Sequence, residues 1–104
     1  MIVYEINLTI DMEIISQFEI WLKEHIKEML QFPGFIEAAI LKPEFDSPHQ
    51  KEALTVQYLI ENREFLEHYF IVHAEKMREK GLISFKSKFS AERRIFERQT
   101  LFYK

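Results

Sequence analysis

The chain has 104 residues and a mass of 12.7 kDa, a size that suits one domain, so we expect a single domain over residues 1–104. With 47% hydrophobic residues, 30% charged residues and no cysteine, the composition excludes a disordered chain, disulfides and cysteine-ligated zinc. The net charge of −3 hides an asymmetry, because residues 1–70 carry 13 acidic and 5 basic side chains whereas residues 71–104 carry 4 and 9. The two halves either attract each other, within a chain or between subunits, or the C-terminal bases form an anion site.

The chain opens with a predicted strand followed by a predicted helix. Residues 2–10 alternate so that every second side chain is apolar, which is typical of a strand. Asp11 suits the N-cap of a helix over residues 12–31, where apolar residues recur at helical spacing. Phe32-Pro33-Gly34 then ends the helix and turns the chain.

A hairpin is predicted next. Residues 35–42 and 53–60 are apolar enough for two strands, and the connection between them is polar and contains His49. Because no helical pattern separates the two strands, we expect them to pair as a hairpin.

The last third predicts a second helix and a fourth strand. Asn62 can cap a helix that runs to about Lys80, with Gly81 as its C-terminal stop and a short helical turn after it. Its inward stripe is expected to be Leu66, Phe70, His73 and Met77. Residues 89–98 fit a strand, and the final residues TLFYK are apolar enough to dock on another surface.

The order β-α-β-β-α-β predicts an α+β, ferredoxin-like fold with both helices on one face of a four-stranded antiparallel sheet. An antiparallel sheet with one face in water should alternate cleanly between apolar and polar residues. The first three strands do not, because they place apolar residues such as Val3, Ala39 and Leu59 on both faces, so we expect a symmetric partner to cover the second face and to form a homodimeric α/β barrel.

The segments IVYEINLTID, FPGF, TVQY and especially HAEKMREKGLISFKSKFSAERRIFE at residues 73–97 resemble a family of small bacterial proteins that is known only as a domain of unknown function. That family lies in the dimeric α/β-barrel superfamily, and the resemblance covers almost the whole chain. It implies the same fold and a dimer, and it brings no activity. The wider superfamily includes cofactor-independent monooxygenases that act on quinols and anthrones, haem-degrading monooxygenases and lactone isomerases, but a shared fold does not transfer function.

Two helical histidines are the candidate proton acceptors, His73 on the apolar stripe of the second helix and His25 beside that of the first. In an oxygenase, His73 would be the base that deprotonates a phenolic or enolic substrate, and Arg78, Arg93 or Arg94 would stabilise the resulting anion. Expected ligand-binding residues are His25, Trp21, Tyr58 and Phe70.

The alternative interpretation is structural. The histidines would then be core or interface residues, and the arginines would pair with Glu5, Glu37 or Glu92 across the sheet or the dimer. Arg93 and Arg94 are adjacent on a strand, so only one of them can reach a given pocket.

Asn7 and His73 match positions that the resemblance associates with haem-degrading relatives, so Asn7 is a further candidate ligand-binding residue. That pattern also needs a tryptophan near the histidine, whereas Trp21 lies in the first helix, so we expect no cofactor. No metal site is expected, because His68 and His73 are five residues apart rather than four. The segment VYEINL resembles a strand of RNA-recognition domains, but residues 53–60 contain no lysine or arginine, so nucleic acid is not an expected partner.

The sequence thus predicts a small α/β-barrel protein that binds an aromatic or anionic molecule between helices and sheet. A cofactor-independent monooxygenase or isomerase and a purely structural module remain the alternatives. Without a signal peptide or an apolar run of about 18 residues, we expect a cytoplasmic protein that does not enter the membrane.

Overall fold

The structure is a computed structural model that describes residues 1–44 and 50–104, so His49 lies outside the described residues. The first half forms β1 (Ile2–Asp11), α1 (Ile15–Met29) and β2 (Phe35–Leu41), and the second half forms β3 (Lys51–Ile60), α2 (Arg63–Val72), α3 (Ala74–Phe85) and β4 (Phe89–Glu97). Two short 3-10 turns, η1 (Met12–Ile14) and η2 (Lys86–Lys88), lead into α1 and β4.

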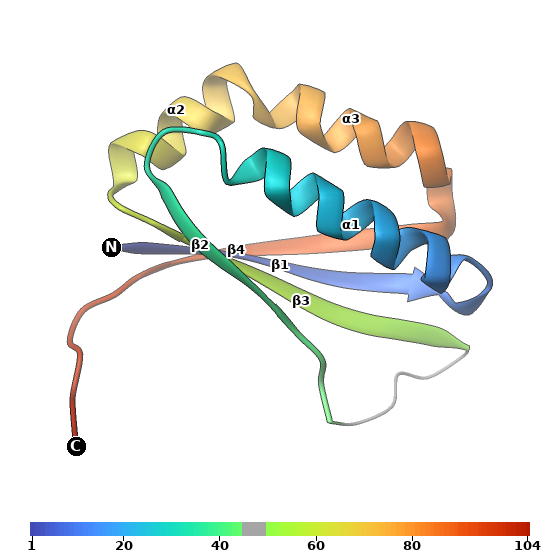
Figure 1. The fold of residues 1–104 in the computed structure, drawn as a ribbon, viewed down its shortest axis with the longest axis horizontal. Helices are drawn as coiled ribbons and strands as arrows, with labels where there is room; N and C mark the ends of the chain where they lie inside the picture. The colour runs from blue at the N-terminus through green and yellow to red at the C-terminus, as the bar shows by residue number, and fades with distance from the viewer. Residues whose placement is uncertain (45–49) are drawn as a thin grey trace.

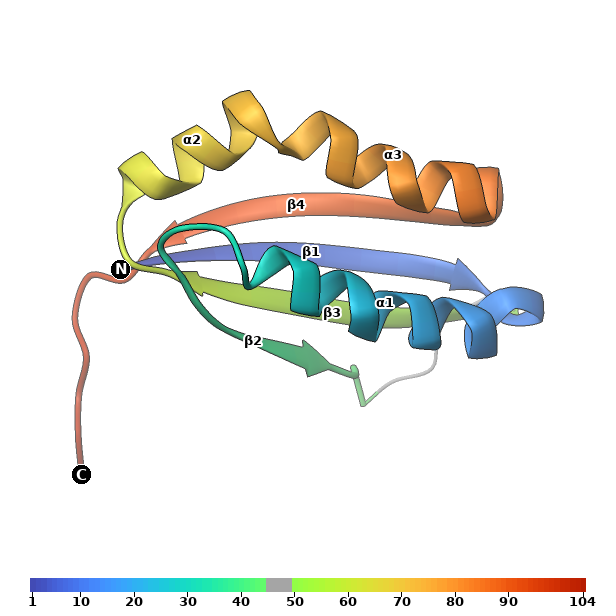
Figure 2. The ribbon, with the colours of Figure 1, turned by 45° about the horizontal axis from the view of Figure 1, so that its top comes forward.

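The strands form one antiparallel sheet in the order β2-β3-β1-β4, and all the helices cover the same face of it (Figures 1 and 2). The predicted ferredoxin-like α+β fold is therefore confirmed. Tyr4 of β1 lies opposite Tyr58 of β3 and Ile95 of β4, so the alternate residues of these strands turn together toward the helices. The core lies between the helices and this face, and its largest fully buried side chains are Tyr4, Tyr58, Phe18, Ile10, Met29, Ile60, Leu66 and Val56.

The start of the first helix differs from the prediction. The chain makes the 3-10 turn Met12–Ile14 before α1 begins, and the Asp11 side chain caps neither helix. Asp11 is instead the last residue of β1, where its carboxylate pairs with the Lys51 ammonium at 3.3 Å. The predicted cap is wrong because the strand continues one residue further and uses this carboxylate in a cross-strand ion pair.

The second predicted helix is interrupted, and Gly81 does not end it. The chain breaks between α2 and α3 at His73, whose φ of −121° is not helical. The helix then continues through Gly81 to Phe85, and the turn is made at Lys86 with a φ of 53°. The predicted cap is confirmed, since the Asn62 side chain accepts a hydrogen bond from the Phe65 backbone N–H at 3.1 Å.

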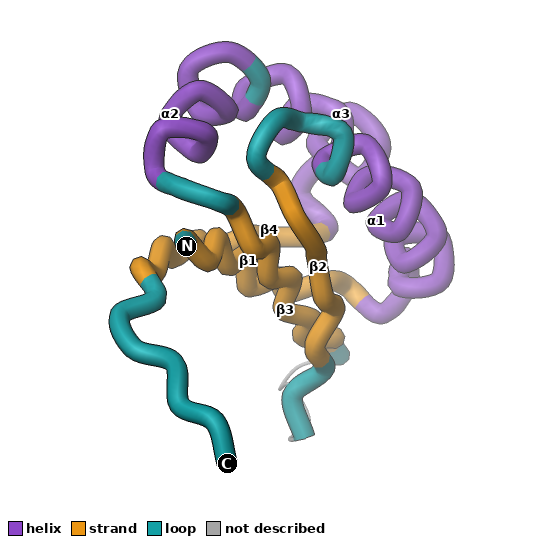
Figure 3. Tube along the Cα trace, turned by 60° about the vertical axis from the view of Figure 1, so that its left-hand side comes forward, coloured by secondary structure: helices purple, strands orange, loops and turns teal. Residues whose placement is uncertain are grey.

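We call the sheet face turned away from the helices the open face; in Figure 3 the helices lie on one side of the sheet and the C-terminal segment leaves on the other side. The strand register places side chains there in rows across β3, β1 and β4. One row is apolar (Leu59, Val3, Phe96) and the next two are mainly polar (Gln57, Glu5, Arg94, then Thr55, Asn7, Glu92). The prediction that this face is unsuited to water therefore holds for one row and not for the whole face.

Candidate functional site

A cavity of about 230 Å³ lies between the helices and the sheet. It is walled mainly by aromatic and aliphatic side chains from every strand except β2 and from all three helices. These side chains include Tyr4, Ile6, Leu8, Phe18, Trp21, Leu22, Met29, Val56, Tyr58, Tyr69, Met77, Leu82 and Phe89. The polar groups that reach it are few, as in ligand pockets generally.

Two polar residues of the cavity wall are Arg78 and Arg93, both of which are also exposed to solvent. Arg78 comes from α3, and its Nη2 donates a hydrogen bond to the Tyr4 hydroxyl oxygen at 3.2 Å. Arg93 comes from β4, where it pairs with Ile6 and shares the inward-facing side of the strand. Burial raises the pKa of Tyr69 to about 12, while the positive charges of Arg78 and Arg93 act against that rise. Both cations therefore act on the Tyr69 hydroxyl inside the cavity.

His25 of α1 supplies the third polar group. Its ring stacks on Trp21 with 4.5 Å between the ring centroids, and its Nδ1 is buried without a hydrogen-bond partner, the single such side-chain atom within residues 1–44 and 50–104. Burial lowers the pKa of His25, although the negative charge of Glu28 acts in the opposite direction. The imidazole is therefore neutral at pH 7, and its Nδ1 is an unused acceptor or donor that the surrounding side chains bury.

Gly81 of α3 packs directly against the edge of the Trp21 ring. A β-carbon at this position would lie 3.0 Å from the edge of the Trp21 ring and 3.2 Å from the Phe89 ring. The missing side chain therefore lets α3 approach the aromatic wall closely. Gly81 has a packing role where the sequence predicted a helix stop.

The structure does not bring every predicted site residue to this cavity. Trp21, Tyr58, His25, Arg78 and Arg93 line it, but His73 does not. The His73 ring stacks on Phe32 with centroids 4.2 Å apart, at the junction of α2 and α3. The helical break there turns His73 out of the stripe that the sequence predicted.

Phe70, Asn7 and Arg94 also lie outside the cavity wall. The Phe70 ring packs edge-on against Tyr4, 5.3 Å between centroids, and thus supports the wall from behind. Asn7 and Arg94 lie on the open face, since they alternate with the inward residues of β1 and β4. As predicted, only one of the adjacent arginines reaches the pocket.

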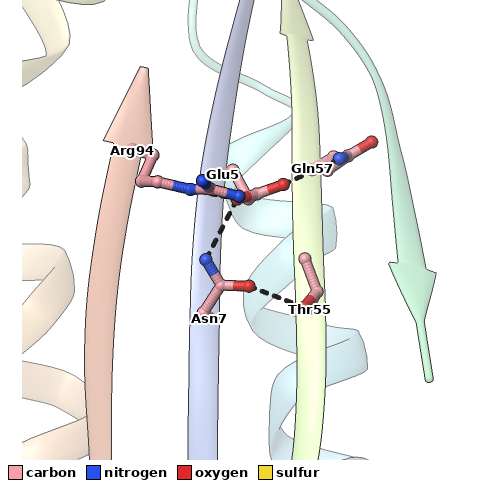
Figure 4. A network of polar contacts seen from close by, with 5 residues as sticks. All are labelled: Glu5, Asn7, Thr55, Gln57 and Arg94. Atoms are coloured by element: carbon pink, nitrogen blue, oxygen red, sulfur yellow. Dashed lines mark hydrogen bonds and ion pairs between the residues drawn. The ribbon is translucent and has the colours of Figure 1, made fainter. Parts of the chain in front are cut away.

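On the open face, Glu5 is the centre of a polar network (Figure 4). Its carboxylate accepts hydrogen bonds from Asn7 at 3.0 Å, Gln57 at 2.9 Å and Arg94 at 2.9 Å, and Asn7 in turn accepts one from Thr55 at 2.7 Å. The Glu5 side chain is 7% exposed and that of Arg94 is 64% exposed. The hydrogen bonds from Asn7 and Gln57, with the Arg94 charge, hold the pKa of Glu5 below its ordinary range.

Sequence reasoning missed two residues of the cavity, Tyr4 and Tyr69. Tyr4 is one of the alternating apolar residues of the predicted strand 2–10, but it is not among the expected ligand-binding residues. Tyr69 was missed because the predicted stripe placed Phe70 inward, whereas α2 buries Leu66 and Tyr69. The spacing of these two residues is the signal that could have identified Tyr69.

The described part of the chain contains no group of three or more histidine, aspartate or glutamate side chains that could hold a metal ion. Among its helices, none is long and apolar enough to cross a membrane.

Comparison with known proteins identifies the family. The profile of the domain of unknown function DUF4286 matches residues 1–99. The chain belongs to this family. The resemblance noted from the sequence is thereby confirmed, and no curated protein sequence matches the chain.

Solved structures of other proteins share the fold. A candidate antibiotic biosynthesis monooxygenase from Deinococcus radiodurans has a TM-score of 0.75 at 10% identity, with 99% of this chain and 97% of that chain covered. SnoaB, a cofactor-independent oxygenase from Streptomyces nogalater, has a TM-score of 0.66 at 14% identity, with 96% of each chain covered. The de novo designed protein Foldit4 has a TM-score of 0.64 at 14% identity, covering 94% of this chain and 98% of that one. An enzyme and a designed protein match about equally well, so these likenesses show the fold alone.

Proposed function

We propose that this protein binds a small aromatic anion in the cavity between its helices and its sheet. The observation that carries the proposal is the pair of guanidinium groups, Arg78 and Arg93, in a cavity whose other walls are aromatic or aliphatic. Guanidinium groups recognise carboxylates and phenolates, and flat apolar walls accept an aromatic ring. The neutral His25 can in addition accept a proton or a hydrogen bond from a hydroxyl group on the ligand.

The volume limits the size of the ligand. An apolar cavity of roughly 150 Å³ holds benzene, and sites for drug-sized molecules run from roughly 300 Å³ upward. The 230 Å³ here suits a compound of one or two fused rings with a single acidic group.

The binding test compares probes that differ only in charge. We expect 2-naphthoate to bind in calorimetric titration at pH 7 and its neutral amide to bind at least ~10-fold more weakly, because the amide loses the charge-assisted contacts. Arg93→Met should remove this preference for the anion. Arg94→Met is the matched control, since it changes the same residue type one position along on the open face and should leave the preference unchanged.

Equal binding of acid and amide would contradict the anion site. If neither binds, nor any other aromatic acid of one or two rings, the alternative of a purely structural module is favoured.

A second candidate function is a cofactor-independent monooxygenase or isomerase. The fold of the oxygenase SnoaB and the histidine in the cavity favour it. In the oxygenase version His25, which lines the cavity, would take a proton from the substrate in place of His73, and an arginine would hold the resulting anion. 1,4-Naphthohydroquinone and O₂ would then give 2-hydroxy-1,4-naphthoquinone and water, with the substrate supplying all four electrons and O₂ accepting them.

Oxygen uptake with a quinol of one or two rings tests this activity. We expect His25→Phe, which retains an aromatic ring beside Trp21, to lower substrate-dependent uptake by at least ~100-fold. His73→Ala should leave most of the uptake, because His73 is outside the cavity wall. Absence of uptake in the unmodified protein would reject the monooxygenase, and the reverse order of the two variants would restore His73 as the base.

The proposal includes a homodimer and a cytoplasmic location. The apolar row Leu59, Val3 and Phe96 on the open face supports the dimer, because a second copy would remove this row from water. The absence of cysteine from the sequence is compatible with a reducing compartment.

A further inference from the structure

The chain leaves the sheet after β4 and ends in a segment with large apolar side chains, residues 99–104. Just after β4, the Arg98 N–H donates a hydrogen bond to the Met1 carbonyl oxygen at 2.9 Å. Beyond it, Leu101 is 52% exposed and both Phe102 and Tyr103 are 86% exposed. Three consecutive large apolar side chains in water are costly, since burying each of them is worth about 1.5–3 kcal/mol.

The direction of this segment is the second observation. It turns to the side of the sheet away from the helices and extends past the open face (Figures 1 and 3). It starts beside the apolar row of the open face, because Glu97 of β4 follows Phe96 directly and lies opposite Ile2. Exposed segment and exposed row thus lie at the same end of the sheet, on the same side.

We propose that residues 99–104 dock on the open face of a second copy of this chain. The inference rests on the homodimer of the proposed function and adds to it a reciprocal exchange of segments, one from each copy. Six extended residues reach about 20 Å, enough to cross several strands of a facing sheet. The apolar row of the partner subunit offers a surface for the leucine and the two aromatic rings.

Residues 100–104 lie beyond the part of the chain that the family profile matches. The match to the family profile therefore includes only the first residue of this segment. A partner of another kind is less well supported, because the segment projects to the one sheet face that the helices leave uncovered.

The first test is the dissociation constant of the dimer, measured by sedimentation equilibrium. Removing residues 99–104, or replacing Leu101, Phe102 and Tyr103 together by serine, should raise this constant at least ~10-fold. The matched control replaces Ile71 and Ile83 by serine, since these are 84% and 68% exposed on the helical side. The control should leave the constant unchanged.

The second test measures whether the segment docks on a partner subunit, on its own chain, or on neither. Trypsin can cut after Arg98, and the rate of that cut should fall at least ~10-fold when the protein concentration is raised through the dissociation constant. A slow cut at every concentration would mean that the segment folds back on its own chain, and a fast cut at every concentration would mean that it docks nowhere. Either result overturns the inference.

The homodimer and the exchange of segments are distinguished by different results. If the full chain sediments as one protomer at all concentrations, the homodimer and the exchange fail together. If the full chain and the shortened chain dimerise equally tightly, the exchange alone is wrong.

Discussion

At the scale of single residues, the open face holds an ionised carboxylate, Glu5, whose side chain is only 7% exposed. Glu5 is protected by its hydrogen bonds to Asn7, Gln57 and Arg94, and these lower its pKa in the folded state. In the unfolded chain the pKa returns to about 4.3. The folded state therefore binds this proton more weakly, and its stabilising contribution is present above about pH 4.3 and is lost as the pH falls through the lowered folded pKa.

We predict that Glu5→Gln lowers the free energy of unfolding at pH 7, because the amide cannot accept from all three donors and leaves Arg94 without its counter-charge. The difference from the unmodified protein should shrink as the pH falls below about 4. Urea unfolding at pH 7, 5 and 3 measures it. A difference that stays constant over this range would show that the ionisation of Glu5 contributes nothing.

At the scale of the elements, the two residues that the sequence predicts as helix N-caps behave differently. The Asn62 side chain caps α2, whereas the Asp11 side chain caps no helix and pairs with Lys51. We predict that Asn62→Ala lowers the free energy of unfolding by about 1 kcal/mol. Asp11→Ala should cost less than about 0.5 kcal/mol, because it removes a half-exposed ion pair and no cap. Thermal and urea unfolding compare the two, and equal losses would contradict the assignment of caps.

At the scale of the whole molecule, the structure leaves one sheet face uncovered. If two copies pack through their open faces, a charge at the apolar row opposes association directly. We predict that Phe96→Glu raises the dissociation constant of the dimer at least ~30-fold, since it buries an unpaired carboxylate. Ile83→Glu on α3 is the control and should not change the mass in sedimentation. A Phe96→Glu chain that still sediments as a dimer would exclude this face as the interface.

Much of the architecture follows from local patterns. Strict alternation predicted β1, and helical spacing with Phe32-Pro33-Gly34 predicted α1 and its end. The ferredoxin-like fold needs no more than this element order and the right-handed crossover. The errors concern the starts and breaks of helices, at Asp11, His73 and Gly81, where packing or an ion pair outweighs local preference.

The candidate site was harder to predict because it joins residues from six elements. The sequence identified Trp21, His25, Tyr58, Arg78 and Arg93 by chemical type, and the structure places all five around one cavity. It could not exclude His73, because a break between two helices rotates the residues that follow it by an amount that no local pattern reveals. Tyr69 lies before this break and three residues after Leu66, so that spacing could have identified it, but the predicted stripe placed Phe70 inward.

The sequence by itself determined the order of the elements, the family and the supply of arginine, histidine and aromatic side chains. It could do so because hydrophobic periodicity and turn residues act between near neighbours in the chain. Only the tertiary structure decided which histidine lines the same cavity as Arg78 and Arg93, and which of the adjacent arginines faces inward. It also decided that an apolar row and an exposed C-terminal segment lie on the same side of the sheet. Those outcomes depend on strand register and helix packing, which are set by contacts between residues far apart in the chain.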